Sequence, residues 1–185
     1  PEVARDKYPY TPTGNREFLE GAPFLDPFQL FAAMSVVTTN IKFAFGVLKL
    51  PIRDPVLTAK QVASLAVMSN ERLPFGIGLS PWIEDFPACG QDWDSRGKRM
   101  DEMIQIIQGL MSGEYFEWKS EFYDIPRIKL CPVPTALPIL YGGHSEAAWR
   151  RAARLCDGFT FAGGKMDYTL EITAKLRSYR KECGR

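Results

Sequence analysis

The sequence is poor in the residues from which metal centres and histidine-based catalytic sites are built. It has a single histidine, His144, among 185 residues. Its four cysteines are widely spaced, with no Cys-x-x-Cys pair: Cys89, Cys131, Cys156 and Cys183. This pattern argues against a zinc site. We predict reduced, mostly buried thiols in a cytosolic protein, and a disulfide between two of them is the less favoured alternative.

The sequence also lacks an excess of one charge and any long apolar run. Its 23 basic and 22 acidic residues give a net charge of +1, and no basic block stands out. Electrostatics therefore give no reason to expect a nucleic-acid partner or an acidic membrane surface. No apolar run approaches the roughly 20 residues that span a bilayer. Neither a Ser/His/Asp triad nor a Walker loop is present.

The start of the chain has none of the features of a targeting segment. Residues 1–7 lack the apolar stretch of a signal peptide, and the first residue is proline rather than methionine. We therefore expect a cytoplasmic protein and interpret the sequence as the middle of a longer one. With 45% apolar and 24% charged residues, the chain can form one soluble globular domain with a sizeable core.

Turn residues and apolar periodicity divide the chain into alternating helices and strands. Asp26 and Pro27 have the residue types of a helix N-cap and first turn. The clearest helix begins at its expected cap, Asp94, and ends at Gly113. The other expected elements are a loop over 1–25, strands over 41–50, 72–79, 137–141 and 157–164, a hairpin or extended excursion over 114–136, and helices from Pro55, from Ser145 to Cys156, and from Met166 or Asp167.

Apolar side chains at helical spacing predict which face of each helix is buried. In chain order these side chains are Leu30, Phe31, Met34 and Val37; Val62, Leu65, Ala66 and Met68; Met100, Met103, Ile104, Ile107, Leu110 and Met111; and Leu170, Ile172, Ala174, Leu176 and Tyr179. Alternating aromatic residues on two strands are also expected in the core: Phe43, Phe45, Phe159 and Phe161. By contrast, a solvated helix start is predicted for Arg96, Lys98 and Arg99.

The alternation of strands and helices implies a parallel sheet joined by right-handed crossovers. We find four β/α units and no internal sequence repeat. Glycine-rich segments follow three of these strands, on the side where ligands sit in open α/β sheets and in (β/α)8 barrels. The sequence thus predicts an α/β fold with its ligand at the carboxyl ends of the strands.

The segment Gly142-Gly143-His144-Ser145 lies at a predicted strand-to-helix junction. Two glycines and a serine there would expose backbone N–H groups at the positive end of a helix dipole, which favours a phosphate. The alternative, favoured by the residues alone, is that Ser145 is a plain N-cap after a glycine turn. A lone histidine is weak evidence for acid–base catalysis, so His144 is expected to position the turn or contact phosphate.

Four stretches carry a family resemblance: Gly46-Val47-Leu48-Lys49-Leu50-Pro51, Arg72-Leu73-Pro74-Phe75-Gly76-Ile77-Gly78, Arg96-Gly97-Lys98-Arg99-Met100-Asp101-Glu102 and Pro138-Ile139-Leu140-Tyr141-Gly142-Gly143-His144-Ser145. In order and spacing the chain resembles the luciferase-like monooxygenases, a (β/α)8-barrel family that binds flavin or deazaflavin, and especially the branch that uses coenzyme F-420. The resemblance implies one incomplete TIM-barrel domain over 1–185, with about four β/α units corresponding to strands 3 to 6. Such a fragment has two open sheet edges, so a homo-oligomer or a covering partner is expected.

The resemblance also implies which residues hold the cofactor. Gly46 and Val47 match a position where relatives form a bulge behind the tricyclic ring, often through a non-prolyl cis peptide. The alternative is a glycine that simply ends a strand. The phosphate is assigned to the backbone amides and the serine hydroxyl of Gly142, Gly143, His144 and Ser145. Gly163 and Gly164 would close the same pocket or belong only to a loop.

Gly78 and Leu79 are expected beside the ring, at the end of the strand over 72–79. Gly76 and Gly78 leave room for a ligand or for close packing of a helix on the sheet. Relatives that use FMN often carry a basic residue just after this strand, whereas Leu79-Ser80-Pro81-Trp82 stands here. That difference favours F-420 over FMN. Trp82 is expected to line the pocket or to pack within the loop.

The activity implied by the resemblance is that of an oxidoreductase. A reduced deazaflavin or flavin would transfer hydride to a small organic substrate or react with oxygen to insert one atom. The acid–base residue of several relatives would fall before Pro1, so no catalytic residue is assigned. Two alternatives stay open: a non-catalytic flavin-binding or interaction protein derived from this fold by truncation, and an unrelated barrel enzyme that acts on a phosphorylated metabolite.

Overall fold

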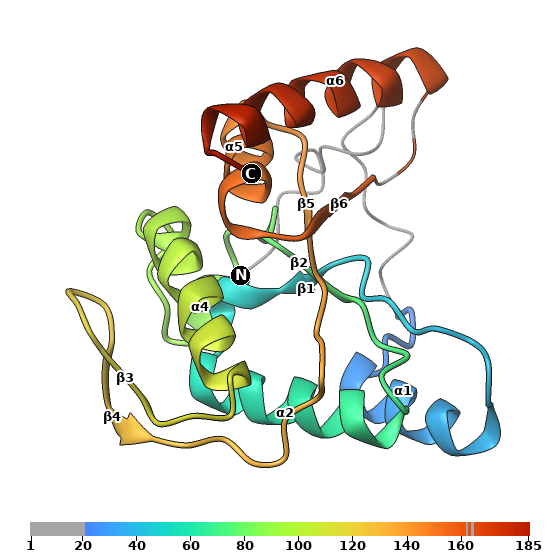
Figure 1. The fold of residues 1–185 in the computed structure, drawn as a ribbon, viewed down its shortest axis with the longest axis vertical. Helices are drawn as coiled ribbons and strands as arrows, with labels where there is room; N and C mark the ends of the chain where they lie inside the picture. The colour runs from blue at the N-terminus through green and yellow to red at the C-terminus, as the bar shows by residue number, and fades with distance from the viewer. Residues whose placement is uncertain (1–20, 162, 164) are drawn as a thin grey trace.

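The computed structural model describes residues 21–161, 163 and 165–185 (Figure 1). Most of the predicted N-terminal loop over 1–25 lies outside these residues. Helices and strands follow one another in this order: α1 (Pro27–Val37), β1 (Leu48–Lys49), the 3-10 turn η2 (Leu50–Ile52), α2 (Pro55–Met68), β2 (Phe75–Gly78), α3 (Asp85–Ala88), α4 (Arg96–Met111), β3 (Phe116–Lys119), β4 (Asp124–Ile128), β5 (Ile139–Gly142), α5 (Glu146–Leu155), β6 (Gly158–Thr160) and α6 (Met166–Glu182).

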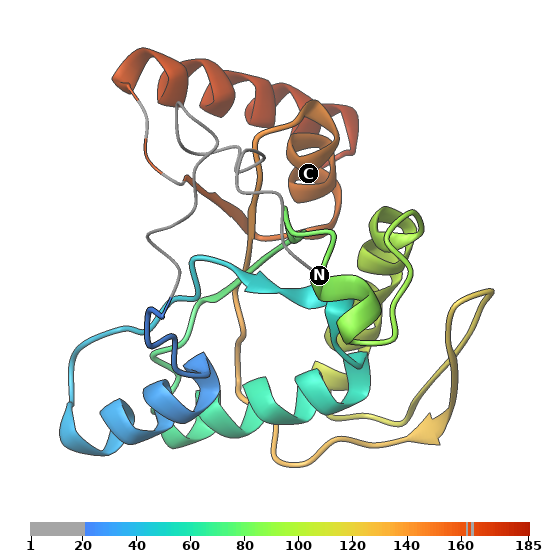
Figure 2. The same ribbon diagram turned by 180° about the vertical axis from the view of Figure 1, so that it is seen from behind.

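Four strands form one parallel sheet in the order β1-β2-β5-β6. Ile77 of β2 pairs with Leu48 on one side and with Tyr141 on the other. The α/β class and the parallel sheet are therefore confirmed. Strands β3 and β4 form a separate antiparallel hairpin within residues 114–136, and Figures 1 and 2 show it projecting away from the sheet. Within the described part of the chain, β1 and β6 are the edges of the parallel sheet.

The core lies between the sheet and helices α2, α4 and α5. On the strands, the side chains of Phe75, Ile77 and Tyr141 have no exposed surface. Helix α4 adds a fully buried apolar stripe that matches the prediction: Met100, Met103, Ile104, Ile107 and Leu110. Because burial of one such side chain stabilises a fold by about 1.5–3 kcal/mol, this stripe anchors α4 firmly in the core, where the helix contacts α2 and η2.

The predicted buried face of α1 is wrong at two of its positions. Leu30 is 38% exposed and Val37 is 79% exposed, whereas Phe28 and Ser35 are buried. The helix turns Phe28 and Phe31 toward the core, where their ring centroids lie 5.1 and 5.0 Å from that of Phe45. Arg72 also donates to the Ser35 carbonyl at 3.0 Å, from the segment before β2.

The predicted strand over 41–50 is also wrong in extent. Only Leu48 and Lys49 pair with β2, so Gly46 and Val47 precede the paired segment instead of ending it. Before them, Phe43 N donates to the Arg72 carbonyl at 2.7 Å, so this segment runs beside the stretch that leads into β2. The Phe45 carbonyl oxygen lies 1.9 Å from the position that a Cβ on Gly76 would take, and regular pairing begins only at Leu48.

The predicted start of α4 needs two corrections. The helix begins one residue after Ser95, and Asp92 rather than Asp94 accepts a hydrogen bond from Ser95 N at 2.7 Å. Arg99 is not solvated but 5% exposed, and it donates to the carbonyls of Pro51 and Asp92 at 2.7 and 2.9 Å. Carbonyls from two other segments satisfy its guanidinium, and helical periodicity cannot detect such partners.

Other burial predictions fail at exposed ends of elements. Met68, the last residue of α2, is 58% exposed, and Leu170, near the start of α6, is 60% exposed. Helix α6 buries only Ile172, and Ala174, which was also expected on its buried face, is exposed. The thiols were expected to be mostly buried, but only Cys156 is; Cys89, Cys131 and Cys183 are exposed, and all four are free. These three cysteines lie just beyond helices or in a loop, where few side chains cover them.

Candidate functional site

The carboxyl ends of the four parallel strands lie in one row. Lys49 pairs with Gly78, Gly78 with Gly142, and Gly142 with Thr160. Residues that pair in a parallel sheet share one face of it. The structure therefore brings together Gly78 and Gly142, which were predicted separately, and adds Lys49 and Thr160, which the sequence analysis did not single out.

Val47 packs over this row. A Cβ on Gly78 would lie 2.6 Å from Val47 Cγ2, and a Cβ on Gly142 would lie 2.7 Å from Val47 Cγ1. Both distances are shorter than real Cβ contacts, so a side chain at either position would force Val47 or the strands to shift. Gly76 is covered by the Phe45 carbonyl in the same way. The close packing at Gly76 and Gly78 comes from the segment before β1, and not from a helix as one of the two expected roles had it.

Gly46 and Val47 are joined by the non-prolyl cis peptide bond that the resemblance implied. Gly46 is exposed, and no atom lies within 4 Å of the position a Cβ would take. Val47 and Leu79 are half-buried, and Leu79 packs against the core just beyond β2. This segment therefore has a packed side, over Gly78, and an open side at Gly46.

The predicted phosphate turn connects β5 to α5. Ser145 is the N-cap of α5, and its Oγ accepts a hydrogen bond from Ala148 N at 3.2 Å. A Cβ on Gly143 would lie 2.7 Å from Ala148 Cβ, so the turn packs closely on the helix. Gly142 is half-buried, whereas His144 is exposed. The N-cap alternative for Ser145 is thus observed, and it leaves donation to an anion open because a serine hydroxyl can accept and donate at once.

One acidic residue lies beside this turn. Glu146 is the first residue of α5 and forms an ion pair with Arg150 at 2.8 Å. The hydrogen bond from Arg150 holds the pKa of the Glu146 carboxyl below its ordinary value. Its negative charge is therefore paired rather than left to repel an anion at the helix start.

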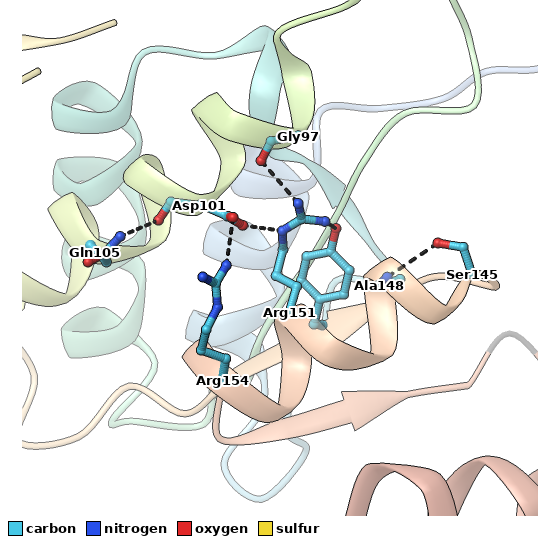
Figure 3. Close-up of polar contacts among 8 residues, drawn as sticks. Gly97, Asp101, Gln105, Ser145, Ala148, Arg151 and Arg154 are labelled. Atoms are coloured by element: carbon cyan, nitrogen blue, oxygen red, sulfur yellow. Dashed lines mark hydrogen bonds and ion pairs between the residues drawn. The ribbon is translucent and has the colours of Figure 1, made fainter. Parts of the chain in front are cut away.

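A polar network on the buried side of the turn joins β5, α5 and α4 (Figure 3). Arg151 donates to Tyr141 Oη at 3.2 Å and to the Gly97 carbonyl at 3.1 Å. Its guanidinium also forms an ion pair with Asp101, whose other oxygen lies 2.7 Å from Arg154 Nη2. Burial raises the pKa of the Tyr141 phenol, and the Arg151 charge opposes that rise. The network thus places the Arg151 guanidinium, with partners for its hydrogen bonds and its charge, on the buried side of the turn.

A charged pair stands at the end of β1. Lys49 Nζ lies 2.5 Å from Asp85 Oδ2, and the buried Ser80 donates to the same oxygen at 3.0 Å. Ser80 also accepts from Trp82 N at 3.0 Å. A lysine of the neighbouring strand therefore lies close to the segment after β2, and its charge is paired with Asp85. The absence of a basic residue between 79 and 82 does not by itself decide between FMN and F-420.

The sequence analysis missed both groups of polar residues. For the network, the stretch 96–102 was a usable signal, because it carried the resemblance and contains Asp101 and Gly97. Arg151 stands in an amphipathic helix in which every arginine looks solvent-facing. For the pair of Lys49 and Asp85, the stretch 46–51 carried the resemblance and contains Lys49, and Asp85 also stood in a segment that resembles the F-420 branch. Their contact could not be predicted, because it depends on the sheet register that places Lys49 beside Gly78.

Gly163 lies beyond the end of β6. It is exposed and has a φ of +96°, a backbone conformation that favours glycine. Thr160, the last residue of β6, lies beside Gly142: a Cβ on Gly142 would be 3.1 Å from Thr160 Cγ2. The strand therefore leads from the glycine row to Gly163, while the prediction for Gly164 falls outside the described residues.

A cavity of about 560 Å³ opens elsewhere, between the start of α4 and the tip of the β3–β4 hairpin. Its lining is Gln91, Asp92, Asp94, Ser95, Lys98, Arg99, Glu121 and Phe122, which includes none of the predicted cofactor residues. Across the described ranges, no three His, Cys, Asp or Glu residues come together as metal ligands would. In those ranges there is also no helix long and apolar enough to cross a membrane.

The family model described as luciferase-like monooxygenase matches residues 7–185. An uncharacterized protein of Mycobacterium tuberculosis is 50% identical over 186 residues, which cover 100% of this chain and 64% of that protein. The FMNH(2)-dependent dimethylsulfone monooxygenase of Pseudomonas fluorescens is 32% identical over 140 residues, or 73% of this chain and 38% of that enzyme. The chain therefore spans less than two thirds of each of these relatives.

A solved structure shows the same fold. The coenzyme F-420 dependent tetrahydromethanopterin reductase from Methanopyrus kandleri matches with a TM-score of 0.76 at 17% identity, over 87% of this chain and 51% of that chain. The parallel sheet is accordingly part of a (β/α)8 barrel, as predicted. Together with the family match over residues 7–185, these findings show that the chain belongs to the luciferase-like monooxygenase family.

Proposed function

We propose that this chain forms the cofactor-holding part of a flavin- or deazaflavin-dependent oxidoreductase that acts on a small organic molecule. The observation that carries the proposal is the meeting of Val47, Gly78 and Gly142 at the carboxyl edge of the sheet. They come from three separate segments, and the turn into α5 begins at Gly142. Membership of the family supports the proposal, because the names of two relatives state dependence on FMNH(2) and on coenzyme F-420.

The donor set at the start of α5 fits a phosphate group. The first N–H groups of a helix have no partner within it, and the positive end of the dipole lies there. The Ser145 hydroxyl stands beside them, and Gly142 and Gly143 carry no side chain over the backbone. FMN and F-420 both contain a phosphate, so these residues and His144 would hold either cofactor.

The segment before β1 fits the edge of a flat ring system. Val47 presents a half-buried methyl surface over the glycine row, and Gly46 borders open space. Gly46 and Val47 would support the ring, with Gly78 and Leu79 beside it and Gly163 closing the loop side. When bound, the cofactor would supply hydride or oxygen chemistry, while the residues of this chain bind and orient it.

We propose F-420 as the preferred cofactor. The segment Leu79-Ser80-Pro81-Trp82 offers no cation of its own, and the Lys49 ammonium is already paired with Asp85. A lysine that is paired with a carboxylate provides less attraction for the compact dianionic phosphate of FMN than a free lysine would. The phosphodiester of F-420 carries a single charge and depends less on such a cation.

Fluorescence titration of the purified chain with F-420 and with FMN tests these proposals. We expect saturable binding of both and tighter binding of F-420. Gly143→Val should weaken binding, because its side chain would collide with Ala148 and displace the turn. Ala33→Val, on the exposed side of α1, is the matched control, and circular dichroism verifies the fold of both variants. Binding of neither cofactor to the unaltered chain would refute the proposed function.

A second measurement separates an enzyme from a protein that only binds the cofactor. The loaded chain is mixed with reductant and oxygen, and cofactor oxidation is followed with and without small organic substrates. We expect substrate-dependent turnover. Binding without turnover would favour a non-catalytic cofactor-binding protein of the same fold.

A further inference from the structure

One hydrogen bond bridges the buried side of the turn over residues 142–145. Tyr141, the residue before the turn, accepts at its Oη from Arg151 Nη1 at 3.2 Å. Arg151 lies in α5, beyond the turn, so this contact joins the end of the strand to the body of the helix. The Tyr141 side chain is fully buried and the Arg151 side chain is 11% exposed, so water competes little for the bond.

Arg151 is in turn fixed from α4. Its guanidinium pairs with the Asp101 carboxylate and donates to the Gly97 carbonyl at 3.1 Å, and Figure 3 shows it between these two residues. A planar guanidinium holds its donors in a rigid fork, so several simultaneous contacts set its orientation as well as its place. Helix α4 is itself anchored by its buried apolar stripe. The hydrogen bond between Tyr141 and Arg151 is therefore held in position by α4, which is packed in the core.

The helix side of the turn is held by contacts of a different kind. Gly143 packs so closely on Ala148 that a Cβ would come within 2.7 Å of it, and Ser145 Oγ accepts from Ala148 N at 3.2 Å. A movement of Tyr141 would carry Gly143 with it through the chain. Because there is no free space between Gly143 and Ala148, that movement would displace the start of α5.

We propose that Tyr141, Arg151 and Asp101 are positioning residues for anion binding at the turn. They set the end of β5 relative to the first turn of α5, so that the backbone N–H groups there converge on one phosphate. The inference rests on the proposed function, since it concerns the phosphate turn. The three residues act through the backbone of the turn rather than by touching the ligand.

The test compares ligands that differ in the phosphate. FMN is paired with riboflavin, and F-420 is paired with the deazaflavin that lacks its phosphodiester chain. Tyr141→Phe removes the hydroxyl and keeps the ring in the core, so the variant is expected to fold. We expect it to lower the affinity for the phosphate-bearing ligand about fivefold, the effect of one lost buried hydrogen bond, and to leave the phosphate-free ligand unchanged. Arg151→Met should lower the ratio of the affinity for the phosphate-bearing ligand to that for the phosphate-free ligand more than Tyr141→Phe does.

Arg154→Met is the matched control, because Arg154 pairs with Asp101 but makes no contact with Tyr141. It should leave the ratio of the two affinities unchanged. If Tyr141→Phe weakens both members of a ligand pair equally, the network only stabilises the fold and the positioning proposal is wrong. If the unaltered chain binds the phosphate-bearing and phosphate-free ligands equally well, the phosphate turn itself fails, and the positioning role fails with it. If Arg151→Met does not fold, the result with Tyr141→Phe still decides.

Discussion

The two sides of the proposed cofactor site are built by different physical means. The turn from β5 into α5 is fixed by polar side chains, through Tyr141, Arg151 and Asp101. The segment before β1 is fixed by shape, because Val47 and the Phe45 carbonyl fill the space that side chains would take at glycines of β2 and β5. One side should therefore respond to changes in hydrogen bonding and charge, and the other to changes in volume.

The largest effect is expected on the side fixed by shape. Gly76→Ala would place a Cβ 1.9 Å from the Phe45 carbonyl oxygen, and backbone on both sides leaves little room to relax. We expect a loss of about 3 kcal/mol in the free energy of unfolding, the upper range for overpacking, measured by urea denaturation. Gly46→Ala on the same segment is the control, with a change within about 0.5 kcal/mol, because open space lies beside it. Equal effects of the two substitutions would contradict steric control of this side.

On the polar side, Asp101→Asn is expected to lower the free energy of unfolding somewhat less than Gly76→Ala does. It removes the carboxylate that neutralises Arg151 and leaves a largely buried cation with only neutral partners. Because the Asp101 side chain is 27% exposed, we expect about 2 kcal/mol rather than the ~3–5 kcal/mol of a fully buried pair. Thermal and urea unfolding at low and high salt measure the loss. A loss below about 0.5 kcal/mol would show that the network is not a stabilising unit.

A pH dependence is expected at the far end of α5. Burial raises the pKa of the Cys156 thiol from 9.0 to about 12. Below pH 9 both folded and unfolded chains keep the proton, so stability is unaffected. Between pH 9 and about 12 the unfolded chain loses it first, so the free energy of unfolding falls as pH rises, by about 1.4 kcal/mol at pH 10.

Urea denaturation between pH 8 and pH 10 measures this slope, and Cys156→Ala should flatten it. The exposed Cys183→Ala is the matched control and should leave the slope in place. If the pH dependence persists in Cys156→Ala, it arises from another group, for example Tyr141, whose pKa is also raised by burial.

The smallest effect on stability is expected for the pair at the end of β1. Lys49→Met removes an ion pair whose side chains are 39% and 29% exposed. The free energy of unfolding should therefore fall by about 0.5 kcal/mol or less. If Lys49 contributes to the choice of cofactor, the same variant should weaken FMN more than F-420 in the fluorescence titration. Equal weakening of both, or none, would remove Lys49 from the site.

Sequence patterns predicted those features whose causes are local. Asp26 caps α1 through a bond from Phe28 N at 2.9 Å, and Ser145 caps α5, as their positions indicated. The hydrophobic stripe of α4 and the parallel order of β/α units were predicted for the same reason, since periodicity and capping depend on near neighbours in the chain. The glycines of the site were also found, although the space expected beside Gly78 is filled by Val47.

Predictions failed where a partner distant in the sequence decides. Arg99 was expected to be solvated but is buried, because the carbonyls of Pro51 and Asp92 accept its hydrogen bonds. At α1, Phe28 and Phe31 pack against Phe45, and Leu30 and Val37 are exposed. In both cases a contact with another segment outweighs the preference of a local pattern.

The sequence alone determined the class of fold, the family and the stretches of the candidate site, because turn chemistry, helical spacing and the order of motifs depend on residues close together in the chain. Only the tertiary structure decided what stands beside each glycine, which arginines lie behind the turn, and that Lys49 meets Asp85. Those outcomes depend on sheet register and on helix packing. Both bring together residues whose separation along the chain hides their contact.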